Sequence, residues 1–252
     1  MFQNPFVINA LAAGLLSGLA GGTTGSFVVA RRISFLAGGI AHAVLGGMGL
    51  AVYLGFNPMA GALLFAVLSA VIIALVKIKL HKHEDTLIGA IWAIGMAVGI
   101  IFISLTPGYN TFLFSFLFGN IMLVDINEIY MLLVMNVLIL TIVFLFFRQF
   151  VFVSFDEEYA KLRGLAADKI YVLLLVIVAL TVVVLMQAVG LILVIALLTL
   201  PAAIAEMFSG SMKQTVLISV VLSILFCWSG VLISFPLSWP AGPTIIILSG
   251  VI

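Results

Sequence analysis

The chain has 252 residues, of which 65% are hydrophobic and 8% are charged, and its formal net charge is +1. A soluble domain carries about 25% charged residues, so this composition excludes an ordinary soluble protein and indicates a polytopic membrane protein. The small net charge argues against nucleic-acid binding. The single cysteine, Cys227, rules out an internal disulfide. No segment is polar enough to form a soluble domain, and we expect one membrane domain covering residues 1–252.

Nine apolar runs follow one another and predict an all-α bundle. They cover residues 6–30, 33–55, 58–76, 86–106, 127–147, 170–186, 190–208, 214–234 and 241–252. A spanning helix needs about 20 apolar residues, which the last run lacks. A further segment, 108–124, is broken by Pro107, Gly108 and Gly119, and its phenylalanines recur at every second position. That period favours an interfacial or re-entrant piece over a spanning helix.

The basic residues predict the orientation of these spans. All ten Lys and Arg residues fall in four places: Arg31–Arg32, Lys77–Lys82, Arg148–Lys169 and Lys213. Positive residues favour the cytoplasmic side, so an even number of crossings must separate successive clusters. This condition leaves segment 108–124 as the one that does not cross. The result is about eight full spans, with a ninth at 241–252 left open, and an N-terminus outside the cytoplasm.

Small residues recur at four-residue spacing inside the spans. Gly14, Gly18 and Gly22 do so in the first span, and Gly95 and Gly99 in the fourth. Glycines at this spacing let helix backbones approach closely in lipid. We therefore expect most of them to mark tight helix–helix contacts.

His42 is the clearest ionisable residue inside a span, and such residues are functional candidates in a membrane. Gly38 and Gly46 lie one turn away on either side, on the same helix face, and are expected to leave an open groove beside the imidazole. Neutral imidazole is a good ligand for zinc and related ions. His42 is thus a candidate metal ligand or pathway residue. The alternative is a histidine that forms a hydrogen bond to a neighbouring helix.

Other candidates are weaker. Pro201 has no amide hydrogen, so a carbonyl one turn earlier lacks its usual hydrogen-bond partner. We expect Pro201 to kink or end its helix, and it is a candidate gate residue. Glu206 is a candidate for an exit path, with a carboxylate that reaches the membrane interface as the alternative. His81–Asp85 contains metal-capable side chains, although a basic connector of this kind is typically a solvated loop. No buried carboxylate pair and no HExxH motif occurs, so we expect no enzyme.

The stretch "SFDEEYAKLRGLAADK" concentrates charge between two spans. It predicts a helix of about two turns, capped by Ser154 or Asp156, with a Glu157–Lys161 pair and an end at Gly164. The predicted helix has one face formed by Asp156, Ala160 and Gly164, and another formed by Tyr159, Leu162 and Leu165. So short a helix is not stable alone in water, which favours a partner packed on it. A solvated connector is the alternative.

Longer stretches resemble the zinc/manganese-type ABC transporter permeases, in order along nearly the whole chain. They are "GSFVVARRISFLAGGIAHAVLGGMGLA", "EDTLIGAIWAIGMAVGI", "FLFGNIMLVDINEI", "VGLILVIALLTLPAAIA" and "PAGPTIIIL". "DEEYAKLRG" resembles the segment by which ABC importer permeases couple to their ATPase, although it is a loose pattern. The family commonly carries Asp four residues before the histidine, whereas this chain has Gly38.

The resemblance implies an all-helical fold of the kind seen in vitamin and metal-chelate importers, in a bacterial or archaeal cytoplasmic membrane. It implies a homodimer surrounded by lipid, two ABC ATPase subunits that use ATP, and an extracytoplasmic metal-binding protein. It implies a transported divalent metal and no permanently bound cofactor. Imidazole without a carboxylate favours zinc, with manganese or iron as alternatives. The residues expected to couple to the ATPase are Asp156, Glu157, Tyr159, Ala160, Leu162 and Gly164. A secondary transporter or channel working alone is the competing interpretation.

Overall fold

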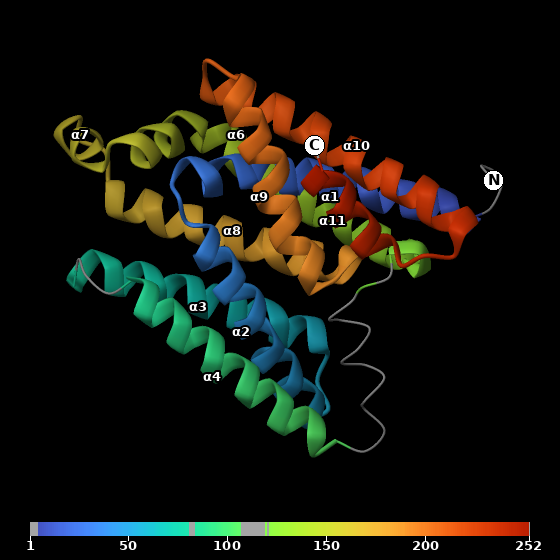
Figure 1. Cartoon of the computed structure of the whole chain (residues 1–252). Helices are drawn as coiled ribbons and strands as arrows, with labels where there is room; N and C mark the ends of the chain where they lie inside the picture. The colour runs from blue at the N-terminus through green and yellow to red at the C-terminus, as the bar shows by residue number, and fades with distance from the viewer. Residues whose placement is uncertain (1–4, 81–83, 107–118, 120, 252) are drawn as a thin grey trace. The chain divides into compact units, whose positions relative to one another are not determined.

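The computed structural model describes residues 5–80, 84–106, 119 and 121–251, and the regular structure within these ranges is entirely helical (Figure 1). The helices are α1 (Pro5–Ala30), α2 (Ser34–Tyr53), α3 (Pro58–Leu80), α4 (Glu84–Ser104), η1 (a short 3-10 helix, Ile121–Leu123), α6 (Ile126–Phe155), α7 (Glu157–Leu162), α8 (Ala167–Val189), α9 (Leu191–Phe208), α10 (Met212–Leu237) and α11 (Ala241–Val251). Within the described residues, eight of them are long and apolar enough to cross a membrane, which confirms the predicted all-α bundle.

Helix α6 continues to Phe155, eight residues beyond the predicted end at 147, so Arg148 lies within a helix rather than in a connector. At 1.5 Å per residue, the 30 residues of α6 extend about 45 Å, which exceeds the roughly 30 Å hydrocarbon core. Helix α11 has 11 residues, about 17 Å, and is too short to cross by itself. Most of the predicted re-entrant segment, 108–124, lies outside the described residues.

The chain divides into two compact units, each drawn from separate stretches of sequence. Unit 1 contains α1, η1, the N-terminal part of α6, the C-terminal end of α8, and α9 to α11. Unit 2 contains α2, α3, α4, the last turns of α6, α7 and most of α8.

In unit 1, glycines on α1 allow α9 and α10 to pack closely against it. A Cβ atom on Gly18 would lie 2.7 Å from a side-chain carbon of Ile224, and one on Gly22 would lie 2.5 Å from the Cα atom of Val220. Both neighbours belong to α10, and both distances are shorter than real Cβ contacts allow. Glycine therefore sets the close α1–α10 packing, as the four-residue spacing predicted.

In unit 2, glycines join α2 to α4 in a regular register. Gly46 faces Gly95, and Gly49 faces Gly99. Gly39 lies against Ile88 two turns before the Gly46–Gly95 contact. Residue numbers increase in the same direction along both helices at these contacts, so α2 and α4 run parallel. Helix α3, which connects them in the sequence, therefore runs antiparallel to both. On α3, Gly61 faces Gly47 of α2, so α3 also packs on α2 (Figure 1).

Pro201 does not end its helix, contrary to one of the two expected outcomes. Helix α9 continues from Leu191 through Pro201 to Phe208. The proline side chain is buried, and Leu197, whose carbonyl loses its usual amide partner, lies beside Gly21 of α1. Neighbouring helices commonly make proline tolerable inside membrane helices.

Candidate metal-path and coupling sites

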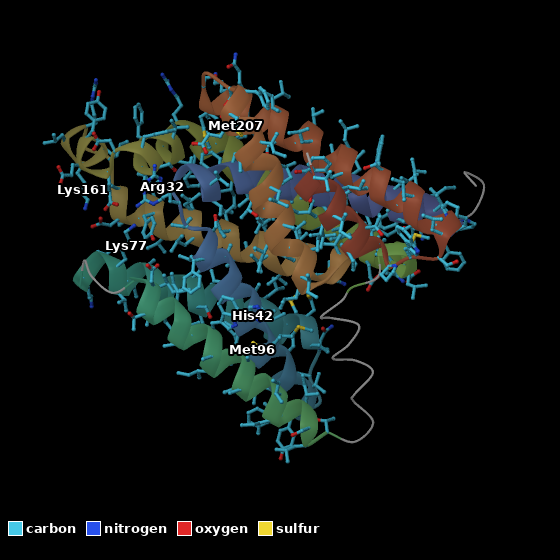
Figure 2. All side chains as sticks on the ribbon, viewed as in Figure 1. Arg32, His42, Lys77, Met96, Lys161 and Met207 are labelled. Atoms are coloured by element: carbon cyan, nitrogen blue, oxygen red, sulfur yellow. The ribbon has the colours of Figure 1, made fainter. Side chains whose placement is uncertain are left out.

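His42 lies near the middle of α2, where it is half-buried (Figure 2). Its imidazole stacks on the indole of Trp92 from α4, with 4.3 Å between ring centroids and 10° between ring planes. The Nδ1 atom of His42 is buried and has no hydrogen-bond partner among the described residues. The alternative expected from the sequence, a hydrogen bond to a neighbouring helix, is therefore not made by this nitrogen.

The two glycines beside His42 differ in their surroundings. Gly38 is buried in α2 one turn before the histidine, where the resembled family commonly has Asp. Gly46 does not border an open groove, and this expectation was wrong. A Cβ atom on Gly46 would lie 2.8 Å from the carbonyl oxygen of Gly95, so the backbone of α4 fills that space. Helix packing explains Gly46 without any role in a path.

Among the described residues, the other metal-capable side chains do not complete a metal site around His42. No group of three or more His, Cys, Asp or Glu side chains is placed to hold a metal ion among the described residues. His81 and His83 lie outside the described residues. Glu206 is exposed near the end of α9 and, like Pro201, belongs to unit 1. His42 is thus a single candidate ligand supplied by unit 2.

Trp92 is the functional candidate that sequence analysis missed. It is one residue within the apolar stretch "EDTLIGAIWAIGMAVGI" and carries no charge that would single it out. The available signal was its seven-residue spacing from Gly99, which puts it on the helix face that carries the glycines. That spacing alone does not identify the residue it contacts on α2.

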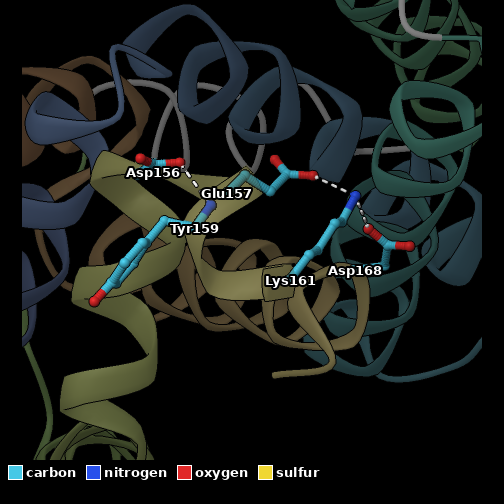
Figure 3. Close-up of polar contacts among 5 residues, drawn as sticks. All are labelled: Asp156, Glu157, Tyr159, Lys161 and Asp168. Carbon is cyan, nitrogen blue, oxygen red and sulfur yellow. Dashed lines mark hydrogen bonds and ion pairs between the residues drawn. The ribbon is translucent and has the colours of Figure 1, made fainter. Parts of the chain in front are cut away.

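The charged segment forms the short helix that the sequence predicted. Asp156 caps α7 by accepting a hydrogen bond from the Tyr159 amide, 2.8 Å from its Oδ1 atom (Figure 3). At the other end, Gly164 has φ +76°, and the amides of Gly164 and Leu165 donate to the carbonyls of Lys161 and Ala160 at 3.0 and 3.1 Å. This pair of hydrogen bonds is a Schellman motif, which glycine favours because it tolerates positive φ.

Lys161 links α7 to the next span. Its ammonium lies 3.2 Å from Glu157 within α7 and 2.9 Å from Asp168 in the first turn of α8 (Figure 3). Asp168, and next Glu157, raise the pKa of Lys161 above its ordinary value, against a small opposing effect of burial. A raised lysine pKa keeps the charged form, and any stability it contributes, until the pH exceeds that pKa. The link therefore persists throughout the physiological range.

On the predicted face formed by Asp156, Ala160 and Gly164, the two end residues are exposed but Ala160 is not. Ala160 is completely buried, so it anchors the helix instead of presenting a surface. Leu162 is 86% exposed, and Tyr159 is partly exposed. Arg163 donates from Nε to the Tyr159 hydroxyl at 2.8 Å, which holds the tyrosine in place. Leu162 and Tyr159, rather than Ala160, form the apolar side of α7 that faces outward.

Two of the basic clusters lie at the same end of unit 2. The ammonium of Lys77, in the last turn of α3, lies 4.2 Å above the ring centroid of Tyr171 in α8. Tyr171 follows Asp168 by one turn, and Asp168 pairs with Lys161. Figure 2 shows Lys77 and Lys161 toward one end of this unit, with His42 farther along. These two clusters thus share one end of unit 2, and the orientation inferred from all four stays a prediction.

The part of the chain that the structure describes contains eight long apolar helices and a short helix between two of them, as expected of a polytopic, all-helical membrane protein. The model of the ABC 3 transport family matches residues 3–252, and the chain belongs to that family. The resemblance drawn from the sequence is thereby confirmed for the family. Its description is that of a family of transporters.

Two curated relatives illustrate the similarity. A Chlamydia pneumoniae membrane protein assigned to a metal transport system is 43% identical over 244 residues, covering 94% of this chain and 83% of the relative. The manganese import system permease protein ScaB of Streptococcus gordonii is 34% identical over 247 residues, covering 98% and 88%.

Two solved structures share the fold. PsaBC from Streptococcus pneumoniae, in complex with Fab, superposes with a TM-score of 0.88 at 33% identity, covering 98% of this chain and 89% of that one. A protein assigned to the metal-chelate type of ABC transporter, in an inward-facing conformation, gives a TM-score of 0.78 at 14% identity, covering 96% and 82%. The expected ABC importer permease fold is confirmed, and the second likeness concerns the fold alone.

Proposed function

We propose that this chain is the permease subunit of an ATP-driven importer of divalent metal ions, and that His42 is a ligand in its translocation path. The observation that carries the proposal is an imidazole near the middle of a spanning helix, with a buried Nδ1 atom that has no partner among the described residues. An unsatisfied polar atom at such a depth is costly, and a passing cation would relieve the cost. The metal-transport names of the relatives support the same class of substrate.

The donor chemistry favours zinc over manganese. The ScaB relative is named for manganese, but this chain has Gly38 where the family commonly has a carboxylate. Manganese prefers oxygen ligands, whereas imidazole suits zinc well. Because His42 is a single ligand, a second copy of the chain related by twofold symmetry would place two His42 side chains along one path. We therefore propose a homodimer.

ATP and substrate delivery come from other polypeptides in this proposal. Helix α7 would dock on an ABC ATPase through Leu162 and Tyr159. Asp156 and Gly164 would keep the ends of this helix formed, and Glu157 would hold Lys161 in its ion pair. An extracytoplasmic metal-binding protein would deliver the ion at the opposite side. Co-purification of an ATPase with the chain would favour this assembly over a transporter or channel that works alone.

Uptake of radiolabelled zinc and manganese tests the role of His42. We expect His42→Ala to lower zinc uptake at least about tenfold, equivalent to about 1.4 kcal/mol, because the path loses its imidazole ligand. Gly38→Asp should raise manganese uptake relative to zinc by restoring an oxygen donor one turn away, and Gly38→Ala controls for the added side chain. Wild-type zinc uptake by His42→Ala, at equal amounts of protein in the membrane, would remove His42 from the path.

Cysteine labelling tests the proposed orientation, with the N-terminus outside and α7 inside the cytoplasm. The only native cysteine, Cys227, is buried, so Cys227→Ala provides a suitable background. Asn127 lies in the first turn of α6 and Leu162 lies in α7, and both side chains are exposed. An impermeant maleimide added to intact cells should label Asn127→Cys and spare Leu162→Cys. Labelling of both from the same side would contradict the topology.

A further inference from the structure

We propose that Trp92 is a positioning residue for the metal path: its indole holds the imidazole plane of His42, in place of the hydrogen bond that usually orients a metal-binding histidine. The inference rests on the proposed role of His42 and assigns to Trp92 a role in how tightly that histidine binds its ion. It concerns only α2 and α4 of unit 2.

Two rings of α2 contact the indole of Trp92. The indole of Trp92 lies parallel to the imidazole of His42 at 4.3 Å, and the ring of Phe35, two turns earlier on α2, meets the indole at 5.7 Å and 40°. Phe35 and His42 are seven residues apart, so they lie on the same face of α2. One indole therefore contacts two rings on that face.

The helix spacing that permits this contact is fixed by glycine. One turn beyond the stack, a Cβ atom on Gly95 would lie 2.5 Å from the Cα atom of Ala43, the residue next to His42. Gly99 and Gly49 make a similarly close approach one turn further. Backbones this close leave α2 and α4 little freedom to separate, so the indole stays against the imidazole.

A stack fixes a histidine differently from a hydrogen bond. Metal-binding histidines usually donate their second ring nitrogen to a carboxylate or carbonyl, which sets the ring orientation and increases ligand basicity. In this proposal the buried Nδ1 atom takes the ion, and the parallel indole of Trp92 restricts the plane of the imidazole ring. The stack thus orients the imidazole in advance without adding the basicity that a hydrogen bond to a carboxylate would supply. This combination suits a site that must capture an ion and then release it.

Zinc uptake kinetics of two variants test the inference. Trp92→Leu keeps an apolar side chain but removes the ring, and we expect it to raise the KM for zinc about tenfold with a smaller change in the maximal rate. Trp92→Phe restores a ring that can stack, and its KM should return to within about threefold of wild type. Thermal unfolding in detergent is measured for both variants, because a structural role alone would reduce uptake only through the amount of folded protein.

Fluorescence supplies a second readout. Co²⁺, a paramagnetic probe that accepts imidazole ligands, should quench the emission of Trp92, measured as the difference between the wild-type chain and Trp92→Phe. His42→Ala should abolish this quenching. No cobalt-dependent difference in the wild-type chain would overturn the inference.

The outcomes separate the two proposals. If His42→Ala abolishes zinc uptake while Trp92→Leu retains the wild-type KM, the positioning role is wrong and the proposed function stands. If zinc uptake falls equally in Trp92→Leu and Trp92→Phe, and falls only as far as the amount of folded protein does, Trp92 serves packing only. If His42→Ala takes up zinc normally, the proposed metal path fails first and the positioning role fails with it.

Discussion

Replacement of Gly95 by valine is expected to separate α2 from α4 and to destabilise the protein by about 3 kcal/mol, with loss of metal uptake. A Cβ atom at this position would lie 2.5 Å from the Cα atom of Ala43 and 3.2 Å from its Cβ atom. Both are parts of the opposing helix that cannot rotate away, so the helices themselves must move. Thermal unfolding in detergent measures the effect.

Gly89 provides the matched control on the same helix. It lies nearly two turns before Gly95, and nothing lies within 4 Å of the position a Cβ atom would occupy. Gly89→Val changes helix propensity by the same amount as Gly95→Val but meets no neighbour. We expect Gly89→Val to unfold close to the wild-type temperature. Equal unfolding temperatures for the two variants would contradict the close α2–α4 packing.

Replacement of Gly164 by valine is expected to uncouple the permease from its ATPase while the spans remain folded. Gly164 has φ +76°, and a residue other than glycine costs roughly 1–2 kcal/mol in this conformation. Valine would therefore disfavour the Schellman hydrogen bonds that end α7. A helix of six residues has little stability of its own and depends on its caps and packing. We expect metal uptake per ATP hydrolysed to fall about tenfold.

Gly164→Asn is the control for this variant, because asparagine tolerates positive φ better than other side chains. No atom lies within 4 Å of a Cβ atom at this position, so the added side chain meets no steric barrier in the chain itself. Transport and ATP hydrolysis are measured together in proteoliposomes that contain the permease and its ATPase. Tight coupling in Gly164→Val would exclude α7 as the ATPase contact, whereas poor coupling in Gly164→Asn alone would indicate a steric rather than conformational effect.

The sequence by itself determined the features that depend on neighbouring residues. Runs of apolar residues placed the eight spans within a few residues, except for the end of α6, because length and hydropathy decide what crosses a bilayer. Gly164 was identified as the end of α7, and its start was narrowed to Ser154 or Asp156, because cap chemistry acts across three or four residues. The four-residue spacing of glycines predicted close packing for the same reason, since it defines one helix face.

Only the tertiary structure decided which surfaces meet. It paired Gly46 with Gly95 and so replaced an expected groove with a helix contact. It buried Ala160, turned Leu162 outward, and joined Lys161 to Asp168 across the α7–α8 turn. It also set Trp92 against His42, residues 50 positions apart in the sequence. The helical repeat predicts which residues share a face of one helix. Which helix packs against that face depends on how separate helices pack together, and local sequence does not determine this.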